Sequence, residues 1–353
     1  MITSFSLSRQ DTSVLKGIAI CAMLFHHMYA CPIADDVAPY DGFLNWIGIL
    51  GKVCVSIFLF CSGYGLSVQY QKTESLFDSV SFVRRRLVKF YLNYWTVFLI
   101  FVPITIWVFN RPLTVPYGEH VNVFKRLVLD LLGVQGYQSY NITWWFNRLI
   151  IVLYLLFPLI YWLTHRIGIV FSILLGLCIF RLFQYLPGQS LLLGYWQFPF
   201  LLGVIWTMLD SNARVRKYLD IPNVNAFLFG VVIVLGVLCV FLRMDYHGTF
   251  WWSREKVDPI ITVLMALFVL LIQNKRNALF RSFSFLGKHS MNIYMIHTFF
   301  NGYWHPEWLH MTGWMRCGIN FIVLMSLCLA TSLLLEFLKH RLGIYKLSNI
   351  IIG

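Results

Sequence analysis

Apolar residues along the chain gather into long runs separated by short polar stretches. About ten runs approach the roughly 20 helical residues that cross the apolar core of a bilayer. They lie near 14–31, 44–68, 87–109, 143–163, 167–186, 191–209, 223–243, 257–273, 289–304 and 314–338. The pattern predicts an all-α protein, a polytopic membrane helix bundle. Residues 1–353 are expected to form a single integral membrane domain with no appended soluble domain.

The polar stretches between the runs alternate in charge. With the N-terminus in the cytoplasm, one side collects Lys72, Arg84, Arg85, Arg86, Lys89, Arg166, Arg214, Arg216, Lys217, Lys275, Arg276, Arg281, Lys288, Lys339, Arg341 and Lys346. The other side collects Asp35, Asp36, Asp41, Glu119, Asp245, Glu255 and Glu307, with Trp251, Trp252, Trp304 and Trp308 as interfacial aromatics. This is the positive-inside distribution of a membrane protein, and an even number of spans returns the C-terminus to the cytoplasm.

The longest outer stretch, residues 110–142, carries its own pattern. An amphipathic segment from Val123 to Leu132 follows Pro112 and Pro116. Such a segment is typical of a helix that lies in the membrane interface. We expect it to form a short helix over the functional site.

Composition supports a membrane protein and limits the possible partners. Hydrophobic residues make up 59% of the chain and charged residues 12%, far from the balance of soluble proteins. The net charge of +13 follows from membrane topology, so a lipid bilayer is expected as a partner and nucleic acid is not. The eight cysteines lie mostly in apolar runs without metal-ligand spacing, which predicts no metal site. Whether Cys31 and Cys317 form a disulfide is left open.

Two ionisable residues interrupt the first apolar run. Lys16 and His27 are eleven residues apart, which on a helix is about 1100° of rotation and about 16 Å of rise. Both therefore share one face, with the imidazole roughly half a bilayer deeper than the amine. Ionisable side chains at membrane depth are costly and usually functional. His26 points about 100° away and is expected to pack against or hydrogen-bond a neighbouring helix.

Five blocks in order along most of the chain resemble the acyltransferase 3 family of membrane-embedded acyltransferases. They are the Lys16-x10-His27 spacing, the run 55–65 (VSIFLFCSGYG), the basic block 82–89 (FVRRRLVK), the pair 143–146 (TWWF) and 153–158 (LYLLFP), and the segment 285–297 (FLGKHSMNIYMIH). The resemblance implies transfer of an acyl group, most often acetyl, from a cytoplasmic thioester to a hydroxyl of a glycan or lipid-linked sugar.

The resemblance also implies roles for individual residues. His27 would be the general base and Lys16 a catalytic cation on the same helix. Acyl-CoA would be a co-substrate, with no permanently bound cofactor, and its phosphates would bind Arg85, Arg86 and Lys89. Arg84 is assigned to topology alone. The expected location is the bacterial cytoplasmic membrane, with the modified glycan in the cell envelope.

The sequence indicates the residues that bind the acceptor less clearly. Arg148 and Arg181, near the outer ends of their helices, would bind an acidic acceptor or the developing oxyanion. His297 is interpreted equally well as a catalytic group or as a buried polar contact. Ser62-Gly63 is better explained by helix packing than by a nucleophilic serine.

The sequence departs from the family pattern in four places. Lysine replaces arginine at Lys16 and Lys89, which removes the two-pronged contact that a guanidinium makes with phosphate. Arg148 stands where some members carry an acidic residue, and the extracytoplasmic hydrolase-like domain of some members is missing. Two alternatives remain: a transporter or flippase of acyl groups or glycans without catalysis, and a membrane sensor or scaffold.

Overall fold

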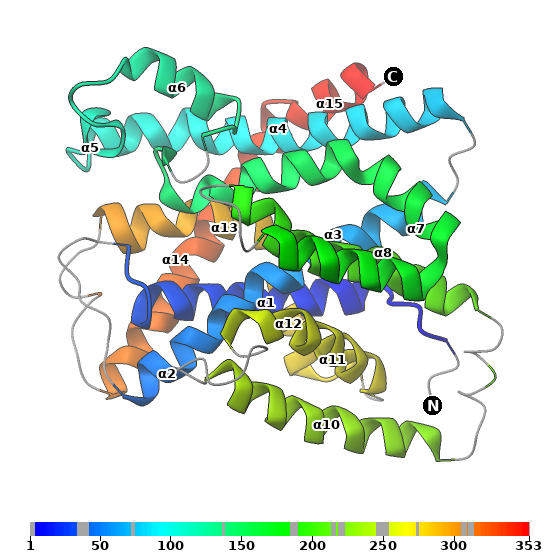
Figure 1. Ribbon diagram of the computed structural model, residues 1–353. Helices are drawn as coiled ribbons and strands as arrows, with labels where there is room; N and C mark the ends of the chain where they lie inside the picture. The colour runs from blue at the N-terminus through cyan, green and yellow to red at the C-terminus, as the bar shows by residue number, and fades with distance from the viewer. Residues whose placement is uncertain are drawn as a thin grey trace. The chain divides into compact units, whose positions relative to one another are not determined.

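The computed structural model describes residues 4–33, 42–71, 75–135, 138–183, 190–212, 217, 223–244, 254–272, 275–304, 309 and 314–352. Every regular element in these ranges is helical, as Figure 1 shows, so the predicted all-α class is confirmed. The chain divides into two compact units that are interleaved in sequence. The first unit comprises 1–26, 41–72 and 157–288, and the second comprises 27–40, 73–156 and 289–353.

The first unit is built around two helices in close contact. Its elements are most of α1 (Arg9–Tyr29), α2 (Phe43–Leu50), η1 (Gly51–Val53), α3 (Cys54–Tyr70), the second part of α7 (Trp145–Phe183), α8 (Ser190–Ser211), α10 (Val224–Arg243), η4 (Arg254–Val257), α11 (Asp258–Leu271) and α12 (Ala278–Lys288). Helices α3 and α8 run side by side in Figure 1. A Cβ atom at Gly63 would lie 2.1 Å from the carbonyl oxygen of Phe200. Small residues thus let the two backbones meet, which is how membrane helices commonly pack.

Helix α1 begins at a capping box. The Ser8 backbone N–H and hydroxyl donate to the Asp11 carboxylate at 2.9 and 2.7 Å, and the Asp11 N–H donates to the Ser8 hydroxyl oxygen at 3.1 Å. Lys275 adds an ion pair to Asp11 at 2.8 Å. Nearly two turns after Asp11, α12 packs against α1, since a Cβ at Gly17 would meet the carbonyl oxygen of Phe283 at 2.0 Å. These contacts fix the start of the helix that carries Lys16 and His27.

The second unit surrounds a buried tryptophan. Its elements are the end of α1, α4 (Leu76–Trp107), α5 (Thr114–Tyr117), α6 (Val123–Leu131), η3 (Ile142–Trp144), the first part of α7, α13 (Ser290–Thr298), the π-helical turn η5 (Phe299–Trp304), α14 (Trp314–Arg341) and α15 (Ile344–Ile352). Trp144 packs edge-on against Tyr94, with ring centroids 5.0 Å apart, and against Phe299 at 5.9 Å. Its ring nitrogen donates to the Met295 carbonyl oxygen at 3.2 Å. The core therefore ties α4, η3, α13 and η5 together.

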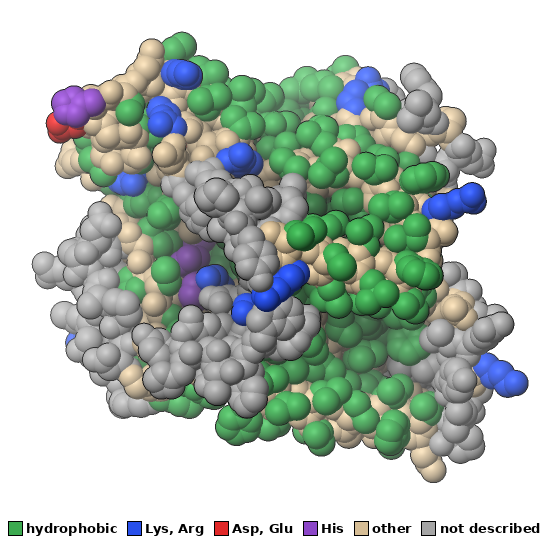
Figure 2. Space-filling view, in the orientation of Figure 1, with side chains coloured by type: hydrophobic (Ala, Val, Ile, Leu, Met, Phe, Trp, Pro, Cys, Tyr) green, Lys and Arg blue, Asp and Glu red, His purple; other side chains and the backbone are tan. Residues whose placement is uncertain are grey.

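Five described helical stretches are long and apolar enough to cross a membrane: Phe43–Tyr70, Asp78–Trp107, Ile142–Leu182, Val224–Arg243 and Arg316–Arg341. Shorter apolar helices occupy Trp196–Leu209 and Asp258–Leu271. Figure 2 shows hydrophobic side chains over much of the described surface on the face in view, as expected of a chain whose solvent is lipid. The protein is a multi-pass membrane protein.

The helix boundaries refine the sequence prediction. The runs 143–163 and 167–186 form one helical stretch, α7, broken at Gly168, where φ is 80°. The amphipathic segment predicted near 123–132 is helix α6. Sequence reasoning missed α12 and α15, which have 11 and 9 residues and are too short to read as spans.

Candidate functional site

Helix α1 contains both Lys16 and His27 without interruption, so the shared face predicted from their spacing follows from its helical geometry. Both side chains are partly buried. The boundary between the two units falls after His26, which places Lys16 in the first unit and His27 in the second. The His26 ring uses Nδ1 to contact the Gly48 carbonyl oxygen of α2 at 2.8 Å, the kind of helix-to-helix hydrogen bond expected for it.

His27 and His297 lie together in the second unit. Their ring centroids are 5.2 Å apart, with the ring planes inclined by 34°. Nδ1 of His27 faces the carbonyl oxygen of Cys31 at 3.3 Å. A carbonyl accepts a hydrogen bond but cannot donate one, so this contact favours a proton on Nδ1 and leaves Nε2 as the basic nitrogen.

His297 is the buried member of the pair, with no exposed surface. Its Nδ1 donates to the Tyr294 carbonyl oxygen at 2.7 Å, which again places the basic lone pair on Nε2. Among the described residues this Nε2 has no hydrogen-bond partner. A buried polar atom left unsatisfied costs free energy, so an atom of this kind next to a candidate catalytic residue points to a ligand or reaction partner.

The π-helical turn η5 holds the backbone of His27 in place. The Asn301 amide donates to the His27 carbonyl oxygen at 2.8 Å, which satisfies a carbonyl at the end of α1. Gly302 lets η5 lie close to Ile33, because a Cβ at this position would lie 2.6 Å from a side-chain carbon of Ile33. Sequence reasoning missed Asn301, although an amide in an apolar run was a signal. π-helical turns are often found at functional sites.

Polar residues at the start of α7 hold α13. The Asn141 amide donates to the Thr298 hydroxyl oxygen, and its carbonyl oxygen accepts from the Thr143 backbone N–H at 3.1 Å and hydroxyl at 2.7 Å. The Tyr294 hydroxyl donates to the Thr143 carbonyl oxygen at 2.7 Å. Tyr294 is thus anchored to Thr143 by a hydrogen bond. These contacts fix both ends of the helix segment that presents His297.

A second polar cluster lies in the segment from Arg111 to Tyr140, next to this site. Asp130 of α6 is fully buried and accepts hydrogen bonds from the Tyr117 hydroxyl, at 2.8 Å, and from the Tyr140 backbone N–H. Burial raises the pKa of Asp130 to about 6. Arg111 lies over the Tyr303 ring of η5, 3.9 Å from its centroid, and donates to the Tyr140 carbonyl oxygen at 3.0 Å. The segment from Arg111 to Tyr140 is therefore joined to the turn that positions His27.

The residues predicted to bind the donor phosphates share part of one helix. Arg85, Arg86 and Lys89 lie on α4, and residues three or four apart on a helix are neighbours. Arg85 donates to the Ser81 hydroxyl at 3.0 Å, and Arg86 lies over the Phe82 ring at 5.2 Å. Lys89 is exposed.

The two predicted acceptor-side arginines are less closely tied to the histidines. Arg148 is exposed near the start of α7, in the same unit as the histidine pair. Arg181 is also exposed but belongs to the first unit. Among the described contacts, neither arginine joins the histidine pair, so their acceptor-binding role stays a prediction.

The end of α1 bears on the expectation that the chain has no metal site. His26, His27 and Cys31 bring their possible ligand atoms within 4.8 Å of one another and could hold a metal ion, so the absence of a metal site stays a prediction. The chain turns back at the end of the helix, which a search for standard spacings does not reveal. Cys31 and Cys317 are both free cysteines; Cys317 is buried, and its carbonyl oxygen accepts from the Tyr29 hydroxyl at 2.5 Å.

Comparison with known proteins supplies the family. A family model described as an acyltransferase domain matches residues 11–341, nearly the whole chain. No curated protein and no solved structure matches the chain. The matched range includes the helix with Lys16 and His27, the basic stretch of α4 and the segment with His297. The chain therefore belongs to the acyltransferase 3 family and is a membrane acyltransferase, a transferase of groups other than aminoacyl groups.

Proposed function

We propose that the protein transfers an acyl group, namely acetyl, from acyl-CoA to a hydroxyl of a cell-surface glycan or lipid-linked sugar, with His27 as general base. The observation that carries this proposal is the partly exposed His27, whose Nδ1 contact with the Cys31 carbonyl oxygen favours a basic Nε2. A sugar hydroxyl is a poor nucleophile at neutral pH, and an imidazole that removes its proton contributes about 10²–10⁴ in rate.

The reaction can be written with each group assigned. The acceptor hydroxyl oxygen attacks the thioester carbonyl carbon while its proton moves to Nε2 of His27. The carbon–sulfur bond then breaks, and the imidazolium returns the proton to the leaving thiolate of CoA. Asn301 holds the His27 backbone, and the ring of His297 packs beside the reacting imidazole.

The donor would bind through its phosphates at the cytoplasmic end of α4. Arg85, Arg86 and Lys89 supply three positive charges there, and charge-assisted hydrogen bonds to phosphate are among the stronger ones in proteins. In the proposed topology both termini would lie in the cytoplasm of a bacterial cell, and Lys16 would lie near the cytoplasmic surface of the membrane. CoA would then reach His27 by extending its pantetheine arm along the membrane normal. Family membership favours catalysis over the transporter and scaffold alternatives.

The experiment measures transfer of labelled acetyl from acetyl-CoA to glycan extracts by purified wild type, His27→Gln and His165→Gln. His165 is an exposed histidine that stacks on Tyr161, so its variant controls for the loss of an imidazole. We expect His27→Gln to unfold at the wild-type temperature, bind acetyl-CoA as well as wild type, and transfer label about 10²–10⁴ times more slowly. Equal transfer by all three proteins would remove His27 from the mechanism.

A further inference from the structure

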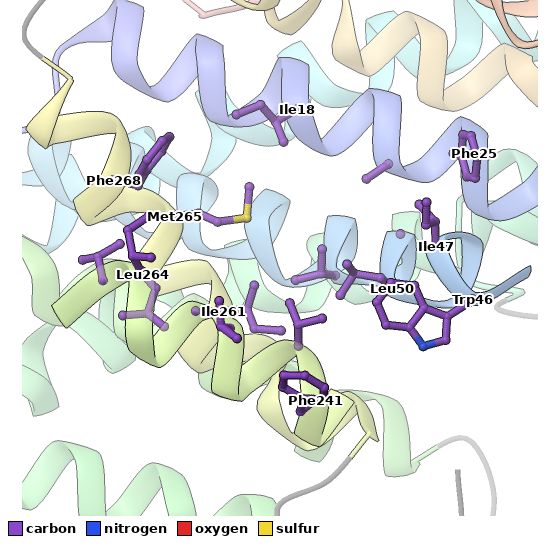
Figure 3. Close-up of a pocket in the computed structure, with 18 residues that line it drawn as sticks. Ile18, Phe25, Trp46, Ile47, Leu50, Phe241, Ile261, Leu264, Met265 and Phe268 are labelled. Carbon is purple, nitrogen blue, oxygen red and sulfur yellow. The ribbon is translucent and has the colours of Figure 1, made fainter. Parts of the chain in front are cut away.

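An apolar cavity of about 640 Å³ lies within the first unit. Its walls come from α1, α2, η1, α10 and α11, and every lining residue is apolar or glycine. Figure 3 shows Ile18 and Phe25 of α1 on one side of the cavity and Ile261 and Phe241 on the other. The volume is within the range of small-molecule binding pockets, about 300–1,000 Å³. The cavity is therefore large enough to hold part of a ligand molecule.

The cavity has a buried inner wall and an outer wall that faces the surroundings. On the inner wall Val53 and Leu264 are 5% and 7% exposed. On α10, Val237 and Phe241 are 54% and 69% exposed. In the most apolar 18-residue window of the span Val224–Arg243, only 11% of the residues are buried and the mean hydropathy is 2.8, so this helix faces lipid. The wall that α10 contributes to the cavity is thus continuous with the lipid-facing surface.

The chemistry of the lining selects the occupant. Water enters a buried site only where polar partners are present, and this lining provides apolar groups. In a membrane protein the medium beside an exposed apolar helix is hydrocarbon. We propose that the cavity binds an acyl chain of a membrane phospholipid.

The geometry of α1 favours a phospholipid over the tail of a lipid-linked acceptor. Ile18, Ala22 and Phe25 line the cavity and, at spacings of four and three, share one face of the helix. His27 is nine residues after Ile18, about 180° around the helix, and Lys16 is about 160° away. An acceptor whose tail entered this cavity would approach α1 from the face opposite the proposed base. A phospholipid acyl chain bound in the cavity would instead pack against the face of α1 opposite Lys16 and His27.

Glycines on α10 provide a matched pair of variants. Gly236 lines the cavity, and a Cβ placed there meets no atom within 4 Å, so Gly236→Leu adds an isobutyl group to the open space. Gly230 is on the same helix, also has open space around its Cβ position, and is not part of the lining. Gly230→Leu therefore controls for a larger side chain on α10.

The test uses vesicles of phosphatidylethanolamine and phosphatidylglycerol containing a trace of phospholipid with a photoactivatable acyl chain. After irradiation, label is mapped by peptide mass. We expect label on the inner wall, at Ala22, Val53 and Leu264, in wild type and Gly230→Leu, and loss of most of this label in Gly236→Leu. Label on the outer face of α10 should stay the same in all three, and the unfolding temperature of Gly236→Leu should not fall.

Two results would overturn the proposal. One is that wild type carries label on the outer face of α10 but not on the inner wall. This result would mean that lipid only surrounds the helix, and it can be obtained without any variant. The other is inner-wall label displaced by polyprenyl phosphate but not by excess phospholipid, which would assign the cavity to an acceptor tail. Neither readout depends on acyl transfer, so a failure here is distinguishable from a failure of the proposed function.

Discussion

At the scale of single residues, Asp130 is the clearest test of electrostatics outside the membrane-spanning segments. Its pKa is raised by burial from 3.8 to about 6, so the folded state holds the proton more tightly than the unfolded state does. Stability is therefore greatest at low pH and is lost as the pH rises through this interval, by about 3 kcal/mol in total. The Tyr117, Ser139 and Tyr94 side chains and the Tyr140 backbone N–H face the carboxylate, and Arg111 lies against the Tyr140 ring.

Asp130→Asn keeps the shape and the acceptor oxygen but removes the titration. We expect the unfolding temperature of wild type in detergent to fall between pH 4.5 and 7 by more than that of Asp130→Asn. Measuring both proteins at each pH cancels the titration of all other groups. Identical pH profiles would mean that Asp130 does not titrate differently in the folded protein.

Residue chemistry was predictable where it depended on local geometry. Lys16 and His27 share a face because they are on one helix, and that follows from their spacing. Asn301 was not predictable, because it contacts a backbone carbonyl 274 residues earlier in the chain. Periodicity along one segment carries no information about which distant segment will provide a hydrogen bond.

At the scale of helices, Gly63 tests how α3 packs on α8. A Cβ at Gly63 would lie 2.1 Å from a backbone carbonyl oxygen of Phe200, and a backbone cannot rotate away as a flexible side chain can. We expect Gly63→Ala to lose about 1–3 kcal/mol of stability through overpacking. The adjacent Ser62 hydroxyl donates to the Phe58 carbonyl oxygen at 2.8 Å within α3, in agreement with a packing role for this pair.

Gly65 supplies the control on the same helix. Its Cβ position meets no atom within 4 Å, so Gly65→Ala should be neutral or raise stability by up to about 1 kcal/mol through better helix propensity. Thermal unfolding of the two variants in one detergent separates the cases. Equal unfolding temperatures for the two would show that α3 and α8 do not pack as closely as the structure has them.

Helix positions were largely predictable, because long apolar runs need helical hydrogen bonding within lipid. The break in α7 at Gly168 agreed with the boundary drawn between two runs. The short helices α12 and α15 were missed for a physical reason. A segment of about ten residues cannot span a bilayer, and its helicity depends on packing with partners that the sequence does not identify.

At the scale of the whole molecule, the division into units was not accessible from the sequence. Each unit draws on three separate stretches of chain, and α1 and α7 each contribute to both units. Hydropathy fixes which residues enter the membrane but not which helices are neighbours, since lipid-facing and buried apolar faces look alike. What joins distant helices here is a small number of buried polar contacts, and these give the most demanding prediction.

Lys339 of α14 is the centre of such a network in the second unit. The side chain has no exposed surface, and its amine donates to Asn93 of α4 at 2.7 Å, to Asn292 of α13 at 2.8 Å and to Glu336 at 3.0 Å. The Tyr345 hydroxyl of α15 donates to the other oxygen of Glu336. One amine thus satisfies acceptors on three helices, and through Asn292 it braces the helix that presents His297.

Lys339→Met should therefore destabilise the protein by about 3 kcal/mol, toward the lower end of the range for a broken buried ion pair, because Glu336 is 37% exposed and water can partly replace the amine. Lys346→Met, at an exposed lysine on α15, should change the unfolding temperature little. If the ion pair itself is responsible, adding Glu336→Gln to Lys339→Met should recover part of the loss, since the carboxylate is then no longer unpaired. Losses that simply add in the double variant, with no recovery, would instead assign the effect of Lys339 to its packing, and the network would not be what holds α4, α13 and α14 together.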